Sequence, residues 1–470
     1  MLTYNLENRD NKPLYEYLYQ CIKNDIETGK IKCGEKLPSK RNLSKHLKLS
    51  IITVESAYEQ LIAEGYIQSR QRIGYYVLPI ATPTHTPAKT VPFAFEKEPE
   101  PIIDFSRNAI GMSHFPFSVW AKIMRQTITN AESSILDIIP FNGILSLRKA
   151  ISMHLFHFRG MSVEPDQIII GAGTELLYSL IIQLLGRDKI YALEDPGYQK
   201  ISHIYEKNGT EDITYINLDE YGVNMDTLNN SSASVLHISP SHHFPTGIVT
   251  PISRRLELLE WVNMKSGRYI IEDDYDSEFR FNGKPLPTMQ SIDTNDKVIY
   301  MNTFSKTLTP SIRVSYMVLP VSLCRTYKKE LGFYSCTVSS FLQEALAEFI
   351  SGGYFEKHIN RMKTFYKIQR KKIIESINST PLKGHSRIKE DNSGLHFLLE
   401  IDTSLSDEEL KKSALSHGIK LTCLSDYFND SQNKDTHTLI INYTSIDDEA
   451  LSHFLPGSEG YKWTEEILKL

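Results

Sequence analysis

The first 78 residues carry a pattern of apolar positions that predicts three helices. After Pro13, apolar residues recur four apart and define one face of a helix that ends at Gly29: Leu14, Leu18, Ile22 and Ile26. Ser39 begins a second predicted helix, which runs to about Lys48. Ser50 caps a third, whose predicted apolar face consists of Val54, Ala57, Leu61 and Ile62.

Two short strand-like runs follow the third helix, at 66–69 and 75–78. Between them lies a short basic turn made of Arg70, Gln71, Arg72, Ile73 and Gly74. Three helices followed by a hairpin are typical of a winged helix-turn-helix. We therefore predict a mainly α-helical N-terminal head of this type.

A proline-rich stretch at 79–101 separates this head from the rest of the chain. It contains six prolines and no glycine. Because proline fixes φ and removes an amide donor, we expect an extended, semi-rigid linker. The predicted domains are a head at 1–78, a linker at 79–101 and a body at 102–470.

The body alternates β-rich runs with helical stretches. Its predicted strands lie at 168–170, 190–193, 235–238, 269–271, 298–301 and 314–319. This alternation predicts an α/β fold with a largely parallel sheet and helices on both faces. Ligands of such sheets bind beyond the carboxyl ends of the strands, so polar motifs at those ends are candidate binding residues.

Charge and composition narrow the choice of partners. Residues 1–78 hold 12 Lys and Arg against 9 Asp and Glu, whereas the whole chain has a net charge of −5. A basic head on an acidic body fits contact with DNA through the head alone.

The sequence shows no signal peptide and no apolar run of membrane-spanning length, so we expect a cytoplasmic protein. The scattered cysteines predict neither disulfides nor a metal site: Cys21, Cys33, Cys324, Cys336 and Cys423.

The segment at 37–77 resembles the DNA-binding domain of the GntR family over nearly its full length. The resemblance implies a double-stranded DNA operator, with the first turn of the third helix in the major groove. The expected contacts lie at the starts of the second and third helices and on the wing: Ser39, Lys40, Arg41, Ser50, Thr53, Arg70, Arg72 and Gly74. The chain departs from the family at Ile51 and Ile52, where an arginine and a small polar residue are usual. Base preference is therefore expected to come from Thr53 and from apolar contacts with thymine methyl groups.

Four motifs of the body resemble those of the fold-type I aminotransferases in order and spacing, and PSHHFPTG (240–247) completes the set. The four motifs are GAGTELL (171–177), EDPGY (194–198), EDDYDSEFRF (272–281) and NTFSKTLTPSIRVSY (302–316). The resemblance implies a binding site for pyridoxal 5'-phosphate. Lys306 corresponds to the lysine that binds this cofactor covalently. The implied phosphate site consists of Gly173, Thr174, Glu175, Thr303, Ser305 and Arg313.

The ring of the cofactor has its own implied partners. Tyr198 stands where the family places the aromatic ring that stacks on the pyridine, and Tyr275 where a hydroxyl contacts the ring oxygen. By similarity to aminoadipate-type aminotransferases, Asp273 is assigned to the pyridine nitrogen, with Asp274 as the competing choice. A carboxylate there keeps the nitrogen protonated and makes the ring an electron sink.

With its head, linker and body together, the chain is identified as a member of the MocR/GabR subfamily of GntR regulators. Membership implies a fold-type I body with a smaller α+β subdomain at about 365–470. It also implies a homodimer, with a head-to-tail arrangement expected. Control of vitamin B6 synthesis is one role that this subfamily includes.

The aminotransferase pattern is broken at several positions. Ile440 occupies the position of the arginine that binds the substrate carboxylate, and the nearest cationic side chain in the sequence is His437. Ile138 replaces a tyrosine that reaches the partner's cofactor, and Phe244 replaces an asparagine. Lys200 stands where some subfamily members carry a second ligand-binding arginine.

These gaps leave three hypotheses for the body. In the first, it is a sensor with no catalytic residues, which binds pyridoxal phosphate or an amine and controls operator binding. In the second, it is a working aminotransferase with a DNA-tethering head. In the third, it serves only for dimerisation. The missing arginine favours the first hypothesis, with the cofactor itself as the preferred effector, and the retained cofactor motifs oppose the third.

Overall fold

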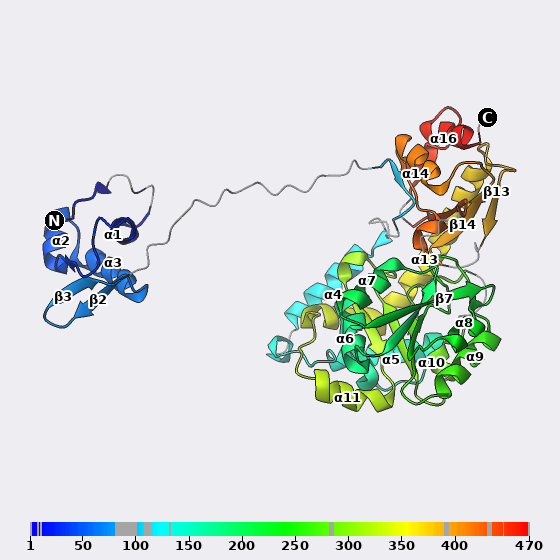
Figure 1. Cartoon of the computed structure of the whole chain (residues 1–470), viewed down its shortest axis with the longest axis horizontal. Coiled ribbons are helices and arrows are strands. Elements are labelled where there is room, and N and C mark those ends of the chain that lie inside the picture. Colours follow the sequence, from blue (N-terminus) through cyan, green and yellow to red (C-terminus); the bar gives the residue numbers. More distant parts are fainter. Residues whose placement is uncertain are drawn as a thin grey trace. The chain divides into compact units, whose positions relative to one another are not determined.

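The computed structural model describes residues 2–6, 9, 12–79, 101–107, 114–130, 133–281, 286–389, 394–429, 435–444 and 446–468. The chain divides into two compact units, Met1–Glu98 and Pro99–Leu470, which contain the head and the body (Figure 1). Nearly all of the predicted linker, at 80–100, lies outside the described residues. None of the described helices is long and apolar enough to cross a membrane.

The head contains three helices and a small antiparallel sheet. Its helices are α1 (Leu14–Glu27), α2 (Lys40–Leu47) and α3 (Ile51–Ala63). Its strands are β1 (Lys36–Leu37), β2 (Ile67–Arg70) and β3 (Gly74–Val77), in the order β1-β3-β2. As predicted, Ser39 and Ser50 cap α2 and α3, and each hydroxyl accepts a hydrogen bond from a backbone amide.

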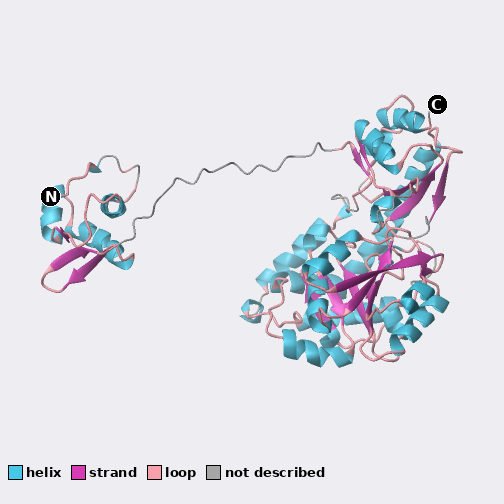
Figure 2. Cartoon of the chain, in the orientation of Figure 1, coloured by secondary structure: helices cyan, strands magenta, loops and turns pink. Residues whose placement is uncertain are grey.

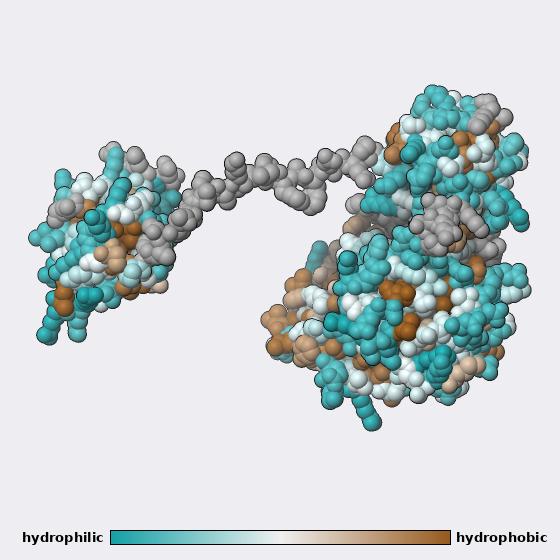
Figure 3. Space-filling model, in the orientation of Figure 1, coloured by the Kyte–Doolittle hydropathy of each residue, from teal (hydrophilic) through white to brown (hydrophobic). Residues whose placement is uncertain are grey.

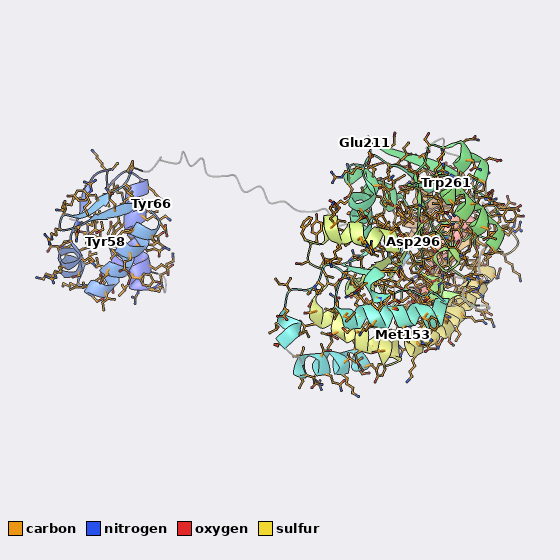
Figure 4. All side chains as sticks on the ribbon, turned by 90° about the horizontal axis from the view of Figure 1, so that it is seen from below. Tyr58, Tyr66, Met153, Glu211, Trp261 and Asp296 are labelled. Atoms are coloured by element: carbon orange, nitrogen blue, oxygen red, sulfur yellow. The ribbon has the colours of Figure 1, made fainter. Side chains whose placement is uncertain are left out.

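Two details of the head differ from the prediction. Strand β1 was not predicted, because its two residues show no pattern of their own and form a strand only by pairing with β3. Ile62 was wrongly assigned to the apolar face of α3 and is 37% exposed. Tyr58, labelled in Figure 4, is buried instead and donates a hydrogen bond to the carbonyl of Pro38 at 2.9 Å.

The body is built on an eight-stranded sheet in the order β5-β12-β11-β10-β9-β6-β7-β8. The strands are β5 (Ile168–Gly171), β6 (Ile190–Asp195), β7 (Asp212–Asp219), β8 (Gly222–Val223), β9 (Val235–Ile238), β10 (Tyr269–Asp273), β11 (Val298–Thr303) and β12 (Ser315–Val318). The neighbouring strands β11, β10, β9, β6 and β7 run parallel to one another. Strand β12 runs antiparallel to both of its neighbours, β11 and β5. All six predicted strands are present, and β7 and β8 were missed.

Helices cover both faces of this sheet (Figure 2). They are α4 (Phe117–Thr129), α5 (Leu145–Arg159), α6 (Thr174–Leu185), α7 (Gln199–Lys207), α8 (Met225–Asn230), α9 (Ile252–Asn263), α10 (Met289–Ile292), α11 (Val321–Leu331) and α12 (Ser340–Ser351). On β10, Ile270 packs in one apolar cluster with Trp261 of α9, which Figure 4 labels. Its neighbour Ile271 packs in another cluster with Leu177 of α6. Successive side chains of a strand point to opposite faces, so both faces are buried.

A smaller subdomain follows the long helix α13 (Tyr354–Asn378). Its antiparallel sheet has the order β13-β14-β16 and consists of β13 (Ser386–Lys389), β14 (His396–Ile401) and β16 (Thr438–Asn442). Its helices are α14 (Asp407–Ser416), α15 (Asp448–Ser452) and α16 (Glu459–Ile467). The start of the body also joins this subdomain, because β4 (Ile103–Asp104) pairs with β15 (Ile419–Lys420).

Candidate functional site

A cavity of about 380 Å³ lies at the carboxyl ends of the central strands of the body. Nine of the ten predicted cofactor residues line it: Thr174, Glu175, Tyr198, Asp273, Tyr275, Thr303, Ser305, Lys306 and Arg313. The tenth, Gly173, lies against Arg313, and a Cβ atom built on it would be 2.1 Å from a guanidinium nitrogen. Residues more than 130 positions apart in the sequence therefore converge on one site.

Asp273 and Asp274 follow each other at the end of β10 and have different surroundings. Asp273 lines the cavity, where its carboxylate accepts a hydrogen bond from the hydroxyl of Tyr178. Asp274 is absent from the cavity lining and pairs with the guanidinium of Arg159 at 2.6 Å. It also accepts a hydrogen bond from Tyr300 at 2.7 Å. The structure thus offers Asp273, not its neighbour, to a ligand in the cavity.

Lys306 lies on the loop after β11, beside two hydroxyl residues. Burial lowers the pKa of its ammonium group from the ordinary value, which favours the neutral, nucleophilic amine. The Thr303 hydroxyl accepts a hydrogen bond from the backbone amide of Ser305 at 3.1 Å. The Ser305 hydroxyl is buried and has no hydrogen-bond partner among the described residues. It is therefore available to a ligand.

Elsewhere in the cavity lining, one carboxylate joins two cations. Glu175, in the first turn of α6, accepts hydrogen bonds from Lys200 and Arg313, both at 2.5 Å. Burial raises the pKa of this carboxyl group, but the two cations outweigh it and lower the pKa to about 2. The predicted phosphate cradle thus contains an ionised acid.

In the head, the predicted DNA contacts fall into three groups. Arg41 is exposed on the first turn of α2, and Arg70 and Arg72 are exposed on the wing. Two other side chains are already engaged: Lys40 pairs with Glu55, and the Thr53 hydroxyl lies 2.8 Å from that of Ser50.

Ile51 and Ile52 of α3 are 47% and 74% exposed, so they remain open to apolar contact. Ser39 and Ser50 act as helix caps, and Gly74 adopts a φ of 129°, which favours glycine.

Comparison with known proteins identifies the family. Residues 14–77 match the model of bacterial regulatory proteins of the gntR family, and residues 100–431 match aminotransferase class I and II. The chain is 38% identical to YdeL of Bacillus subtilis, which is named an uncharacterized HTH-type transcriptional regulator, over 87% of this chain and 88% of YdeL. The chain belongs to the MocR/GabR subfamily of GntR regulators.

Other relatives agree with this assignment. The regulator is 29% identical to a probable rhizopine catabolism regulatory protein, MocR, of Rhizobium meliloti, over 95% of this chain and 93% of MocR. It is also 29% identical to the pyridoxine biosynthesis transcriptional regulator PdxR of Corynebacterium glutamicum, over 87% and 88% of the two chains. It is therefore a DNA-binding transcription regulator with an aminotransferase-like body.

The fold of the body is that of solved aminotransferases. The multiple substrate aminotransferase of Thermococcus profundus has a TM-score of 0.69 at 21% identity, covering 79% of this chain and 93% of that chain. The kynurenine aminotransferase of Pyrococcus horikoshii has a TM-score of 0.67 at 22% identity, covering 79% and 92%. The predicted fold class, a winged helix-turn-helix joined to a fold-type I body, is confirmed.

The structure also places the positions at which the sequence is expected to depart from the enzymes. Ile440 is fully buried in β16 and does not line the cavity, whereas Asn442 on the same strand does. Phe244 lines the cavity and stands edge-on to Tyr198, with ring centroids 5.7 Å apart. Ile138 is 88% exposed and lies outside the cavity lining.

Several cavity residues were missed by sequence reasoning. Tyr178 and His237 contact Asp273 from α6 and β9, and Tyr427 and Asn442 belong to the smaller subdomain. Tyr178 follows Thr174 by one helical turn, which is a usable signal once α6 is known. For Tyr427 and Asn442 the sequence holds no local signal, because their approach depends on how the subdomain packs.

Proposed function

We propose that the body of this regulator binds pyridoxal 5'-phosphate and that its occupancy controls binding of the head to an operator in the cytoplasm. The observation that carries this proposal is the convergence of Lys306, Asp273 and Arg313 on one cavity. An amine, a carboxylate and a guanidinium match the aldehyde, the pyridine nitrogen and the phosphate of that cofactor.

Unpartnered polar atoms support the fit of this group. In the part of the chain that the structure describes, the buried Ser305 Oγ, Asp273 Oδ1 and His237 Nε2 have no hydrogen-bond partner. Buried polar atoms are normally paired, so these atoms favour a polar ligand. Ser305, Thr303 and Arg313 would hold the phosphate, Asp273 the pyridine nitrogen and Lys306 the aldehyde carbon. When bound, the cofactor supplies an electrophile that reacts with primary amines.

The cavity lining favours the cofactor itself over an amino acid as the effector. An amino acid needs a cation for its carboxylate, and Ile440 takes the place of the arginine that provides it. We therefore propose a sensor without sustained transamination, although a primary amine remains a second possible effector.

A homodimer is part of the proposal. Large apolar side chains are exposed on α4 and around the 3-10 helix Ser133–Leu136: Phe117, Ile128, Leu136 and Ile138. Figure 3 shows brown atoms gathered at the corresponding edge of the body. Contiguous exposed apolar surface of this kind favours a protein interface, and a second copy in a head-to-tail arrangement is the proposed occupant.

DNA-binding measurements test the proposal directly. Duplexes selected from a random library by the purified protein serve as operators, and anisotropy gives the affinity with and without pyridoxal phosphate. We expect the cofactor to change the affinity of the wild type and of Lys329→Ala, an exposed control. Lys306→Ala should lose both this response and the visible absorption of the bound cofactor. A protein that stays colourless with the cofactor would overturn the proposed site, and unchanged DNA affinity of the loaded protein would overturn the sensor role.

A further inference from the structure

The predicted phosphate cradle already contains a negative charge. Thr174 and Glu175 open α6, whose N-terminus attracts anions. The Glu175 carboxylate lies 2.5 Å from Nη2 of Arg313 and 2.5 Å from Nζ of Lys200. All three charged side chains line the cavity, each of them partly exposed. Glu175 therefore occupies the cations that a phosphate would use.

The rest of the cradle suits a phosphate. The Ser305 hydroxyl is buried without a partner, and Thr303 and Thr174 line the same cavity. Gly173 lets the Arg313 guanidinium approach the backbone, since a Cβ there would lie 2.1 Å from its nitrogen. The backbone of Arg313 is left-handed, with a φ of 48°. This conformation is strained for a residue other than glycine.

From this arrangement we infer that Glu175 competes with the cofactor phosphate for Arg313 and Lys200 and sets the affinity of the body for pyridoxal phosphate. This inference rests on the proposed function and deepens it. A phosphate carries nearly two negative charges and must displace the carboxylate from Arg313 or bind beside it. Both routes weaken binding, the first by breaking an ion pair and the second by repulsion between like charges.

A weakened phosphate site is useful to a sensor. A body that binds the cofactor too tightly stays loaded at every concentration and reports nothing. Glu175 would lower the affinity through the phosphate alone, because Lys306 would bind the aldehyde carbon and Asp273 the pyridine nitrogen. It is thus an affinity-setting residue rather than a holder of the phosphate, which reverses the role expected from the sequence.

Removal of the charge tests this role. The full-length apo protein, Glu175→Gln and Glu211→Gln are titrated with pyridoxal phosphate and with pyridoxal, which lacks the phosphate, and absorbance gives each dissociation constant. Glu211 is an exposed acid on the body and lies outside the cavity lining (Figure 4). We expect Glu175→Gln to bind pyridoxal phosphate about tenfold more tightly, the order expected for like-charge repulsion in a site that water reaches. Its affinity for pyridoxal, and both affinities of Glu211→Gln, should match the wild type.

A second measurement separates this inference from the proposed function. Orthophosphate is added to the apo proteins, and the thermal midpoint is followed. It should raise the midpoint of Glu175→Gln more than that of the wild type. Equal or weaker binding of pyridoxal phosphate by Glu175→Gln, or an equal gain for pyridoxal, would overturn the inference. If the wild type binds no pyridoxal phosphate, the proposed function fails, and the orthophosphate response alone decides the role of Glu175.

Discussion

Asp273 and Asp274 are consecutive residues with separate partners: Asp273 accepts a hydrogen bond from Tyr178 in the cavity, and Asp274 pairs with Arg159 outside its lining. Both carboxylates are buried, so neither is a solvated surface charge. Each has one oxygen without a hydrogen-bond partner among the described residues, but only Asp273 lines the cavity, whereas Asp274 joins α5 to the end of the sheet. We therefore expect Asp273 to serve cofactor binding and Asp274 to serve folding.

Substitution of the two aspartates should affect different properties of the protein. Asp273→Asn should weaken binding of pyridoxal phosphate at least about tenfold, because the protonated pyridine loses its counter-ion, and should leave the apo protein folded. Asp274→Asn should instead lower the free energy of unfolding by about 3–5 kcal/mol, because the buried guanidinium of Arg159 loses its carboxylate partner. Urea unfolding and absorbance titration measure the two effects. The reverse pattern would reassign the pyridine partner to Asp274.

Two neighbouring cations of the head should differ in their contact with DNA. Arg41 is exposed, whereas Lys40 pairs with Glu55 of α3. Arg41→Ala should reduce the slope of log affinity against log salt by about 0.9, the value for one lost phosphate contact. Lys40→Ala should change this slope less, because its charge is already neutralised. The affinity of both variants for the operator is measured at salt concentrations between about 50 and 200 mM, and the slope is taken from these values. A larger effect at Lys40 would show that its ion pair opens on DNA.

Glu278 should make the stability of the body depend on pH. Burial and the nearby Asp274 raise its pKa from 4.5 to about 8. Between these values the folded protein keeps a proton that the unfolded chain loses, so stability falls as pH rises from about 4.5 through 8. The slope due to this group is at most about 1.4 kcal/mol per pH unit.

Glu278→Gln mimics the protonated group and should flatten this dependence. Urea unfolding of the full chain at pH 6, 7 and 8 measures it, with Glu211→Gln as an exposed control that keeps the wild-type slope. Identical slopes for the wild type and Glu278→Gln would show that Glu278 ionises normally in the folded body.

The sequence predicted those parts of the molecule that depend on local patterns. Ser39 and Ser50 cap helices wherever they precede a run with helical periodicity, and the strand ends placed Asp273 and Lys306 together. Pairing and packing over long separations were not predictable. The two residues of β1 form a strand only through β3, and Glu175 meets a cation 138 positions away. We propose a different role for Glu175 for that reason, although its motif alone suggested a phosphate ligand.

The last prediction concerns the predicted absence of the arginine that binds the substrate carboxylate in aminotransferases. We expect the wild type to show no multiple turnovers with common amino acids and 2-oxoglutarate. Productive proton transfer needs the substrate held in one orientation, and the sequence predicts that Ile440 replaces the arginine that does so. Asn442 reaches the cavity from the same strand but carries no charge to pair with a carboxylate.

Ile440→Arg should restore the missing cation. Arginine is long enough to extend past the position of a buried isoleucine, and a bidentate pair with a carboxylate contributes roughly 1.5–3 kcal/mol, or about tenfold to a hundredfold in affinity. The spectral change of the loaded protein gives this affinity for alanine and for ethylamine, which lacks the carboxylate. Only the affinity for alanine should increase, and binding of pyridoxal phosphate should stay unchanged.

Ile441→Arg is the matched control, because Ile441 packs in the apolar core and its replacement should only destabilise the body. Multiple turnovers by the wild type would show that another residue binds the carboxylate, and the body would then be a working aminotransferase.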